Sequence, residues 1–126
     1  MGYTIITPDE QRFATPSWRA DAPDGREIVE LPLLANLEHS RSHLWRYPPH
    51  TTGRRHLQTV QEEVFVVLGG MVTMMLGEEG ERHELPPRSL VVLEPRTPIY
   101  IVNETDEEAV FFAYGAPTDQ GAEIFD

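Results

Sequence analysis

Three polar side chains within residues 54–70, RRHLQTVQEEVFVVLGG, have the types and spacing needed for shared chemistry. His56 and Gln58 lie two residues apart, and Glu63 stands at the start of a long apolar run. Residues two apart in a β-strand point to the same face, so we expect the imidazole and the amide to face the same way. A carboxylate on the next strand would join them in one apolar cavity. Such a set could bind a metal ion or a small molecule.

The carboxylate of Glu63 needs a partner if it points into a barrel, because burial disfavours the charged form. It therefore binds a cation or a ligand donor, or it forms a salt bridge with Arg54 or Arg55. Arg54 has the same strand parity as the imidazole and the amide, and an Arg–Glu pair there could clamp a small carboxylate. A shift of register by one residue would instead turn Glu62 inward.

The elements that must position these groups are short strands. Apolar runs separated by turn signals predict an all-β chain of about nine strands with no substantial helix. Several runs are apolar on both faces, which favours a barrel, or a sandwich that uses one face for dimerisation. The Gly69-Gly70 link between the runs 64–68 and 71–76 predicts a β-hairpin. Further strands are expected over 28–37, 42–47, 81–85, 89–93, 99–102 and 109–114.

The chain of 126 residues fits a single domain with one core. We expect an N-terminal arm over residues 1–27, a barrel over 28–117 and a C-terminal tail over 118–126, with coil from Gly115 onward. Trp18 in the arm needs an apolar surface to pack against. Its own barrel and a partner subunit are both candidates.

The amino-acid composition disfavours several classes of binding partner and of chemistry. Ten basic residues against 21 acidic ones give a net charge of −11, which disfavours nucleic acid and anionic membranes. The absence of cysteine removes disulfides and thiol catalysis. The N-terminus has no signal-peptide pattern and no apolar run approaches the roughly 20 residues of a membrane span, so we expect a cytoplasmic protein.

With strands and breaks placed, the chain resembles the cupin superfamily, in particular its small single-domain bacterial members. The phrase QEEVFVVLGG is very similar to the EEVFYVLEG of that group. The resemblance covers about residues 29–117 and implies a double-stranded β-helix, or jelly roll, that is commonly a homodimer. The first family motif aligns as His50-x5-His56-x-Gln58-x4-Glu63-x6-Gly70, and the second as Arg88-x5-Glu94-x-Arg96-x2-Ile99-x3-Asn103.

The resemblance also implies where a metal would lie. Metal-bearing cupins use two histidines and a glutamate of the first motif and a histidine of the second, which become His56, Gln58, Glu63 and Ile99. An amide is a weaker ligand than imidazole, isoleucine cannot coordinate, and transition-metal sites generally need three protein ligands or more. We therefore expect no metal cofactor, or a weakly held divalent Mn, Fe, Ni or Zn. Four other histidines are the candidates to complete the site: His39, His43, His50 and His83.

The expected function is binding of a small-molecule ligand in the barrel cavity by a homodimer whose metal site is incomplete. One alternative is a metal-dependent cupin enzyme of the dioxygenase, isomerase or cyclase type. Another is a structural dimer partner whose barrel is filled by side chains. Strand parity and the resemblance together give the expected pocket residues: Arg54, Trp45, Tyr47, Phe65, Met74, Ile99 and Ile101.

Overall fold

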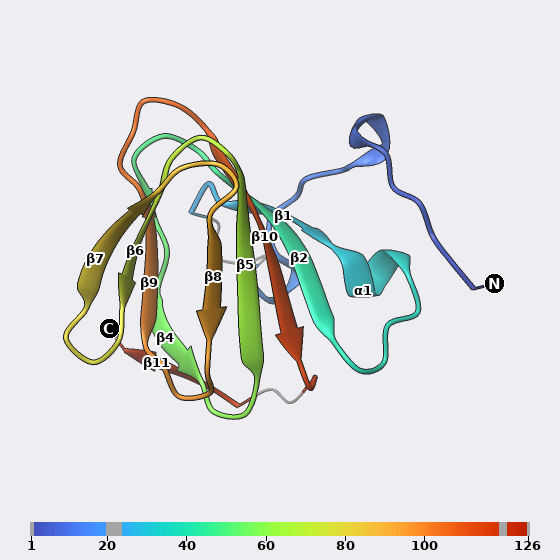
Figure 1. Cartoon of the computed structure of the whole chain (residues 1–126). Helices are drawn as coiled ribbons and strands as arrows, with labels where there is room; N and C mark the ends of the chain where they lie inside the picture. The colour runs from blue at the N-terminus through green and yellow to red at the C-terminus, as the bar shows by residue number, and fades with distance from the viewer. Residues whose placement is uncertain (1, 20–23, 119–120, 126) are drawn as a thin grey trace.

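The computed structural model of the chain describes residues 2–19, 24–118 and 121–125. Its strands form two antiparallel sheets that face each other (Figure 1), which confirms the predicted all-β jelly roll. The first sheet has the order β1-β2-β10-β5-β8, and the second has the order β11-β4-β9-β6-β7 with β3 paired to β9. The strands are β1 (Glu27–Glu30), β2 (Arg41–Tyr47), β3 (Thr51–Thr52), β4 (Arg55–Gln58), β5 (Glu62–Gly69), β6 (Val72–Leu76), β7 (Glu81–Leu85), β8 (Leu90–Leu93), β9 (Ile99–Asn103), β10 (Ala109–Ala116) and β11 (Ala122–Phe125).

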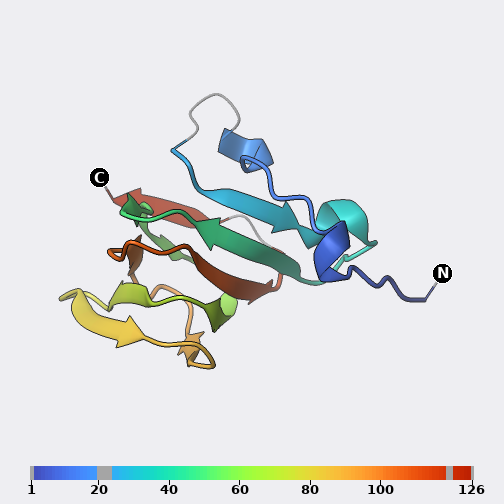
Figure 2. The same cartoon turned by 90° about the horizontal axis from the view of Figure 1, so that it is seen from above.

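Helical structure in the described residues is confined to short pieces: α1 (Leu31–Leu34) and the 3-10 turns Pro8–Glu10 and Ser17–Arg19. The strand predicted over 28–37 is therefore wrong beyond Glu30. Pro32 lies in the first turn of α1, where its missing N–H is not needed. Seen from above (Figure 2), the N-terminal residues run along β1, to which Ala14 is bridged through Ile28. No described helix has the length and apolar character to cross a membrane.

The hairpin predicted at Gly69-Gly70 is wrong, because the two strands that flank it belong to different sheets. β5 pairs with β10 and β8, whereas β6 pairs with β7 and β9. Gly70 has a positive φ of 74°, and a Cβ there would lie 2.4 Å from the carbonyl oxygen of Glu108. The glycine thus lets the chain cross tightly from one sheet to the other.

Coil was predicted from Gly115 onward, and this prediction is wrong because part of the C-terminal tail is a strand. Residues Ala122–Phe125 form β11, which pairs antiparallel with β4 and closes the edge of the second sheet. Ile124 lies directly opposite His56 in this pairing. The tail therefore becomes a neighbour of the strand that carries the imidazole and the amide.

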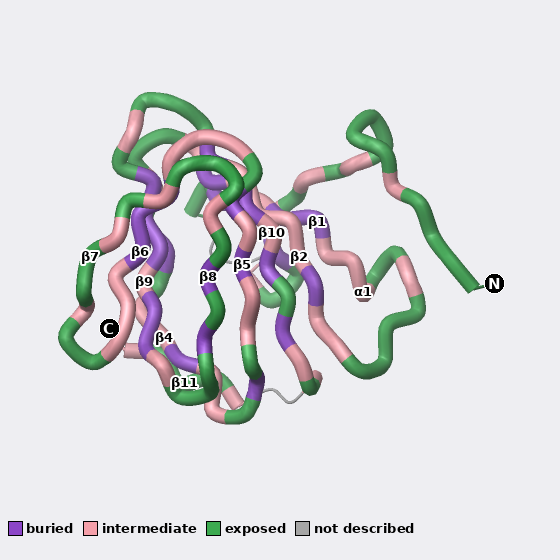
Figure 3. Tube along the Cα trace, in the orientation of Figure 1, coloured by how far each residue is buried: buried purple, intermediate pink, exposed green. Residues whose placement is uncertain are grey.

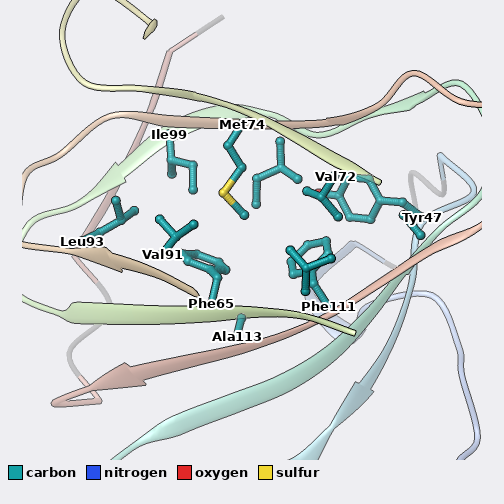
Figure 4. Close-up of a cluster of buried hydrophobic side chains, with 12 residues drawn as sticks. Tyr47, Phe65, Val72, Met74, Val91, Leu93, Ile99, Phe111 and Ala113 are labelled. Carbon is teal, nitrogen blue, oxygen red and sulfur yellow. The ribbon is translucent and has the colours of Figure 1, made fainter. Parts of the chain in front are cut away.

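Side chains between the sheets form one apolar core. β8 alternates exposed and buried residues (Figure 3), as a strand does when one face packs inward. Phe65 and Phe111 from the first sheet meet Met74 and Ile99 from the second (Figure 4). Each such side chain, fully buried, contributes about 1.5–3 kcal/mol to the free energy of unfolding.

Asn103, the last residue of the second family motif, is a fully buried structural residue. Its Nδ2 donates to the carbonyl oxygens of Tyr47, Pro48 and Glu107 at 3.1, 3.0 and 2.7 Å. Its Oδ1 accepts from the backbone N–H of Thr105 at 3.0 Å. The amide therefore ties the end of β9 to the end of β2 and to the turn before β10.

Candidate functional site

A cavity of about 510 Å³ lies between the two sheets. Its wall combines side chains of both sheets with residues of the N-terminal segment and of β11. Trp18 and Ile124, which are 48% and 52% exposed, lie where this wall meets the surface. The lining residues are Trp18, Arg19, Arg26, Arg41, His43, Trp45, Tyr47, Arg54, His56, Gln58, Gln61, Glu63, Phe65, Ile101, Ala113, Tyr114, Gly115, Ala122 and Ile124.

The three groups predicted to act together do meet in this cavity. His56 and Gln58 project from β4, and Arg54, immediately before the strand, lies on the same face. Glu63 enters from β5, while its neighbour Glu62 is exposed. The register therefore turns Glu63 inward, and not Glu62.

The apolar residues expected to line the pocket divide into two groups. Trp45 and Tyr47 on β2, Phe65 on β5 and Ile101 on β9 are in the cavity wall. Met74 and Ile99, by contrast, are fully buried in the packed core (Figure 4) and do not line the cavity. Their strand parity is inward, but neighbouring side chains fill the space in front of them.

Arginine dominates the charge of the wall. Arg19, Arg26, Arg41 and Arg54 line the cavity, and Glu63 is the one carboxylate among the lining residues that the structure describes. Aromatic rings hold two of these guanidinium groups in place. The centre of the Arg26 group lies 5.6 Å from the Trp45 ring and 5.7 Å from the Tyr47 ring, and that of Arg41 lies 5.7 Å from Trp18.

Arg26 is the most firmly fixed of the four, with only 6% of its surface exposed. It forms an ion pair with Asp24 at 2.6 Å and donates to the hydroxyl of Tyr47 at 3.4 Å. Gly53 leaves room for this arrangement, because a Cβ there would lie 2.7 Å from the Tyr47 hydroxyl and 3.2 Å from the guanidinium. The guanidinium is therefore prepositioned behind the aromatic wall.

The imidazole of His56 has a defined tautomer. Its Nδ1 lies 2.9 Å from the carbonyl oxygen of Arg54, and since a carbonyl only accepts, Nδ1 carries the proton. Burial lowers the pKa of His56, which favours the neutral ring. Nε2 of that ring is then a lone-pair acceptor.

Burial shifts two further groups in the cavity in opposite directions. It raises the pKa of Glu63 to about 7, although the positive charge of Arg41 opposes the shift. It lowers the pKa of His43 to about 4, and here the charge of Arg41 acts in the same direction. Near neutral pH, His43 is therefore uncharged and Glu63 is only partly ionised.

Two amide atoms in the wall have unmet hydrogen-bonding capacity. Gln58 Oε1 and Gln61 Nε2 are buried and have no hydrogen-bond partner among the described residues. Gln61 is 3% exposed as a whole residue. Buried polar atoms are normally paired, so each of these two atoms has a hydrogen bond left for a water molecule or a bound group to complete.

The residues at the family's metal positions do not fit a transition-metal centre. Ile99 lies directly opposite His56 in the β4–β9 pairing, as the motif alignment implies, but its side chain is apolar and fully buried. Gln58 offers only a neutral amide oxygen. Across the described part of the chain, no group of three or more His, Cys, Asp or Glu side chains is arranged to hold a metal ion.

The other histidines do not complete the set. His50 lies 2.6 Å from Asp106, and His83 lies 3.0 Å from Glu81, each at the surface. His39 is exposed. His43 does line the cavity, with its ring 5.4 Å from that of Trp18.

Several lining residues were not predicted from the sequence. Arg26 and Gln61 lie outside the strands that were expected to form the site, and Ala122 and Ile124 lie in the tail. Among the residues outside the expected strands, Trp18 was the one whose type indicated packing on an apolar surface. It contacts its own barrel, with its ring 6.1 Å from that of Trp45, and it remains 48% exposed.

Comparison with known proteins agrees with the fold. Residues 43–115 match the family described as "Cupin domain" (Cupin_2). No curated protein matches the chain.

Three solved structures resemble the whole molecule. A sugar phosphate isomerase of the cupin superfamily from Silicibacter pomeroyi superimposes with a TM-score of 0.80 at 23% identity, over 98% of this chain and 82% of that one. KdgF from Halomonas sp. gives 0.73 at 16%, over 92% and 96%. The polyketide cyclase RemF from Streptomyces resistomycificus gives 0.82 at 12%, over 98% and 86%. At these sequence identities the likeness shows a shared fold alone.

Proposed function

We propose that this chain, which belongs to the cupin domain family, binds a small organic anion in the cavity between its sheets. Arginine side chains recognise the anion, and the family's metal site remains incomplete. A volume of about 510 Å³ falls within the range of small-molecule sites, roughly 300–1,000 Å³. A cavity of this size also favours ligand binding over a barrel that serves only as a structural dimer partner.

The distribution of charge carries this proposal. The chain has no lysine, so its ten basic residues are all arginines, and four of them line the cavity. The chain as a whole has 21 acidic residues and a net charge of −11, yet the described wall contains a single carboxylate. A cavity wall rich in guanidinium groups attracts anions. Guanidinium groups pair with carboxylate and phosphate in a bidentate geometry.

The aromatic contacts strengthen the case because they fix the arginines before any ligand arrives. Arg26 is held by Trp45, Tyr47 and Asp24, and Arg41 lies over Trp18. Side chains ordered in advance lose less entropy on binding. The Silicibacter pomeroyi neighbour is described as a sugar phosphate isomerase, which supports including phosphates among the anions to be tested.

The test compares anions with neutral analogues of the same shape. We expect benzoate and hexanoate to raise the melting temperature of the protein more than benzamide and hexanamide do. Simple phosphate esters should likewise raise it more than neutral analogues of the same shape. Only the charged member of each pair forms a charge-assisted, bidentate contact with a guanidinium group. Equal stabilisation by charged and neutral members would contradict the proposal.

A metal-dependent cupin enzyme is the second candidate. It is favoured by the lone pair on Nε2 of His56, which faces the same cavity as Glu63, and by the names of the isomerase and cyclase neighbours. Metal analysis of untagged protein separates the two candidates. Near-stoichiometric Mn, Fe, Ni or Zn that is lost in His56→Ala would favour the enzyme.

A further inference from the structure

Two glutamine side chains in the cavity have opposite needs. Gln58 Oε1 is a hydrogen-bond acceptor, and Gln61 Nε2 is a donor. Both atoms are buried, both residues line the cavity, and neither atom has a partner in the described structure. A ligand that completes both groups supplies a donor to the first and an acceptor to the second.

An anion alone cannot meet both needs. Carboxylate and phosphate oxygens accept hydrogen bonds, so they can satisfy Gln61 Nε2 as well as the arginines. An ionised oxygen has no hydrogen to give to Gln58 Oε1. The ligand therefore carries a second group that donates.

The surrounding charge favours a neutral donor. An ammonium group would be repelled by the four arginines of the wall. A hydroxyl group is neutral and donates one hydrogen bond while accepting others, so it can serve both amides.

We infer that the bound anion is hydroxylated, as in a hydroxy acid, a sugar acid or a sugar phosphate, and that Gln58 Oε1 accepts a hydrogen bond from a ligand hydroxyl while Gln61 Nε2 donates one. This inference rests on the proposed function, because the arginines supply the anion site next to which the ligand hydroxyl is recognised. A hydroxyl donor distinguishes such ligands from fatty or aromatic acids that would fill the same volume.

Gly115 on β10 is a positioning residue for this recognition. A Cβ at this position would lie 2.8 Å from Gln61 Oε1 and 3.2 Å from its Cδ. The missing side chain lets the amide of Gln61 lie close against β10. A larger residue at 115 would move the amide.

The experiment measures calorimetric affinities for two matched pairs of probes. Gluconate is compared with hexanoate, which has the same carboxylate and chain length without hydroxyls, and glycerol 3-phosphate is compared with propyl phosphate. We expect at least tenfold tighter binding of the hydroxylated member in one pair or both, since a hexanoate or propyl chain leaves the buried acceptor unpaired. The pair that shows the difference identifies the charged group as carboxylate or phosphate.

Gln58→Met keeps the length of the side chain and removes the acceptor. We expect it to reduce the preference for the hydroxylated probe at least fivefold, while affinity for the deoxy probe stays within twofold. Gln11→Met, in the N-terminal segment outside the cavity, is the matched control and should keep the preference. An equal loss for both probes would contradict the role of Gln58.

The remaining outcomes separate this inference from the proposed function. If hexanoate and propyl phosphate bind wild-type protein as tightly as their hydroxylated partners, the inference is overturned and the anion site stands. If none of the four anions binds, both fall. The wild-type comparison decides the matter even if Gln58→Met does not fold.

Discussion

Glu63 on β5 and His43 on β2 face the same cavity, and they make the stability of the protein depend on pH with opposite signs. The pKa of Glu63 is raised to about 7, so between its ordinary value and about 7 the folded chain holds a proton that the unfolded chain has lost. Stability from this group therefore falls as pH rises through that window. The pKa of His43 is lowered to about 4, so stability from this group falls as pH drops from about 6.5 toward 4.

Glu63→Gln isolates the first effect. We expect the variant to match wild-type stability near pH 4.5, where the carboxyl is protonated, and to exceed it near pH 8 by up to about 3 kcal/mol. Urea unfolding at the two pH values gives the comparison, and Glu62→Gln, at the exposed neighbouring position, is the control. A loss of stability at pH 8 would instead mean that the ionised carboxylate has a stabilising partner.

Single residues also show how far the sequence determines the site. The period-two rule placed Arg54, His56 and Gln58 on one face because all three lie in or beside one short strand. Gln61 lies between β4 and β5, where no periodicity applies, and its position depends on contact with Gly115 of a strand about fifty residues later. Contacts of this kind are set by tertiary packing and leave no local pattern.

At the scale of elements, the Gly69-Gly70 link shows that two neighbouring apolar runs do not determine how their strands pair. A hairpin and a crossing between facing sheets both need two apolar strands and a tight, glycine-rich connection. The difference lies in the partners, which for β5 are β10 and β8 and for β6 are β7 and β9. The strands themselves were predictable, whereas their pairing depended on segments far away in the chain.

Gly70→Ala tests the tight crossing. We expect it to reduce the free energy of unfolding by about 3 kcal/mol or more, because a Cβ would lie 2.4 Å from the Glu108 carbonyl oxygen and the φ of 74° is itself unfavourable for alanine. Gly77→Ala is the matched control, since its φ of 83° is similar but a Cβ there meets nothing within 4 Å. The control should cost only about 1–2 kcal/mol. Equal losses in the two variants would show that contact with Glu108 is unimportant.

At the scale of the whole molecule, the outer face of the first sheet is apolar and exposed over part of β8 and β5. Leu90 and Val92 on β8 are 68% and 72% exposed, and Leu68 on β5 is 54% exposed. The register extends this surface, because Val64 lies between Val92 and Tyr114, and Val66 lies between Leu90 and Phe112. These two rows contain no charged residue. A face of this kind is typical of an interaction surface.

The homodimer expected from the sequence remains a prediction, and this face is the surface on which we place it. Two copies with a net charge of −11 repel each other elsewhere, so an uncharged apolar face favours a two-fold contact. Sedimentation should show a dimer for the wild type and a monomer for Val92→Glu. Val60→Glu, a 44% exposed valine outside the two rows, should leave the dimer intact. A wild-type protein that is monomeric at all concentrations would contradict the prediction.

The cavity, too, belongs to the molecule as a whole. Its wall needs the N-terminal Trp18 and Arg19, strands of both sheets, and β11 from the C-terminal tail. The fold class and the strands that carry the chemistry were accessible from spacing and family resemblance. The excess of arginine in the cavity wall could not be predicted from the sequence. Arg26 and Arg19 reach the cavity only because the N-terminal segment packs on β2.

The most direct test of the anion site is a calorimetric titration of Arg54→Gln with the tightest-binding anion found for the wild type. Removing one guanidinium should raise the dissociation constant at least tenfold, since hydrogen bonds to charged groups contribute about 1.5–3 kcal/mol. Arg88→Gln, an exposed arginine outside the cavity, should leave it within twofold of the wild-type value. If both variants bind the anion as tightly as the wild type, and Arg41→Gln does too, the cavity arginines do not recognise anions.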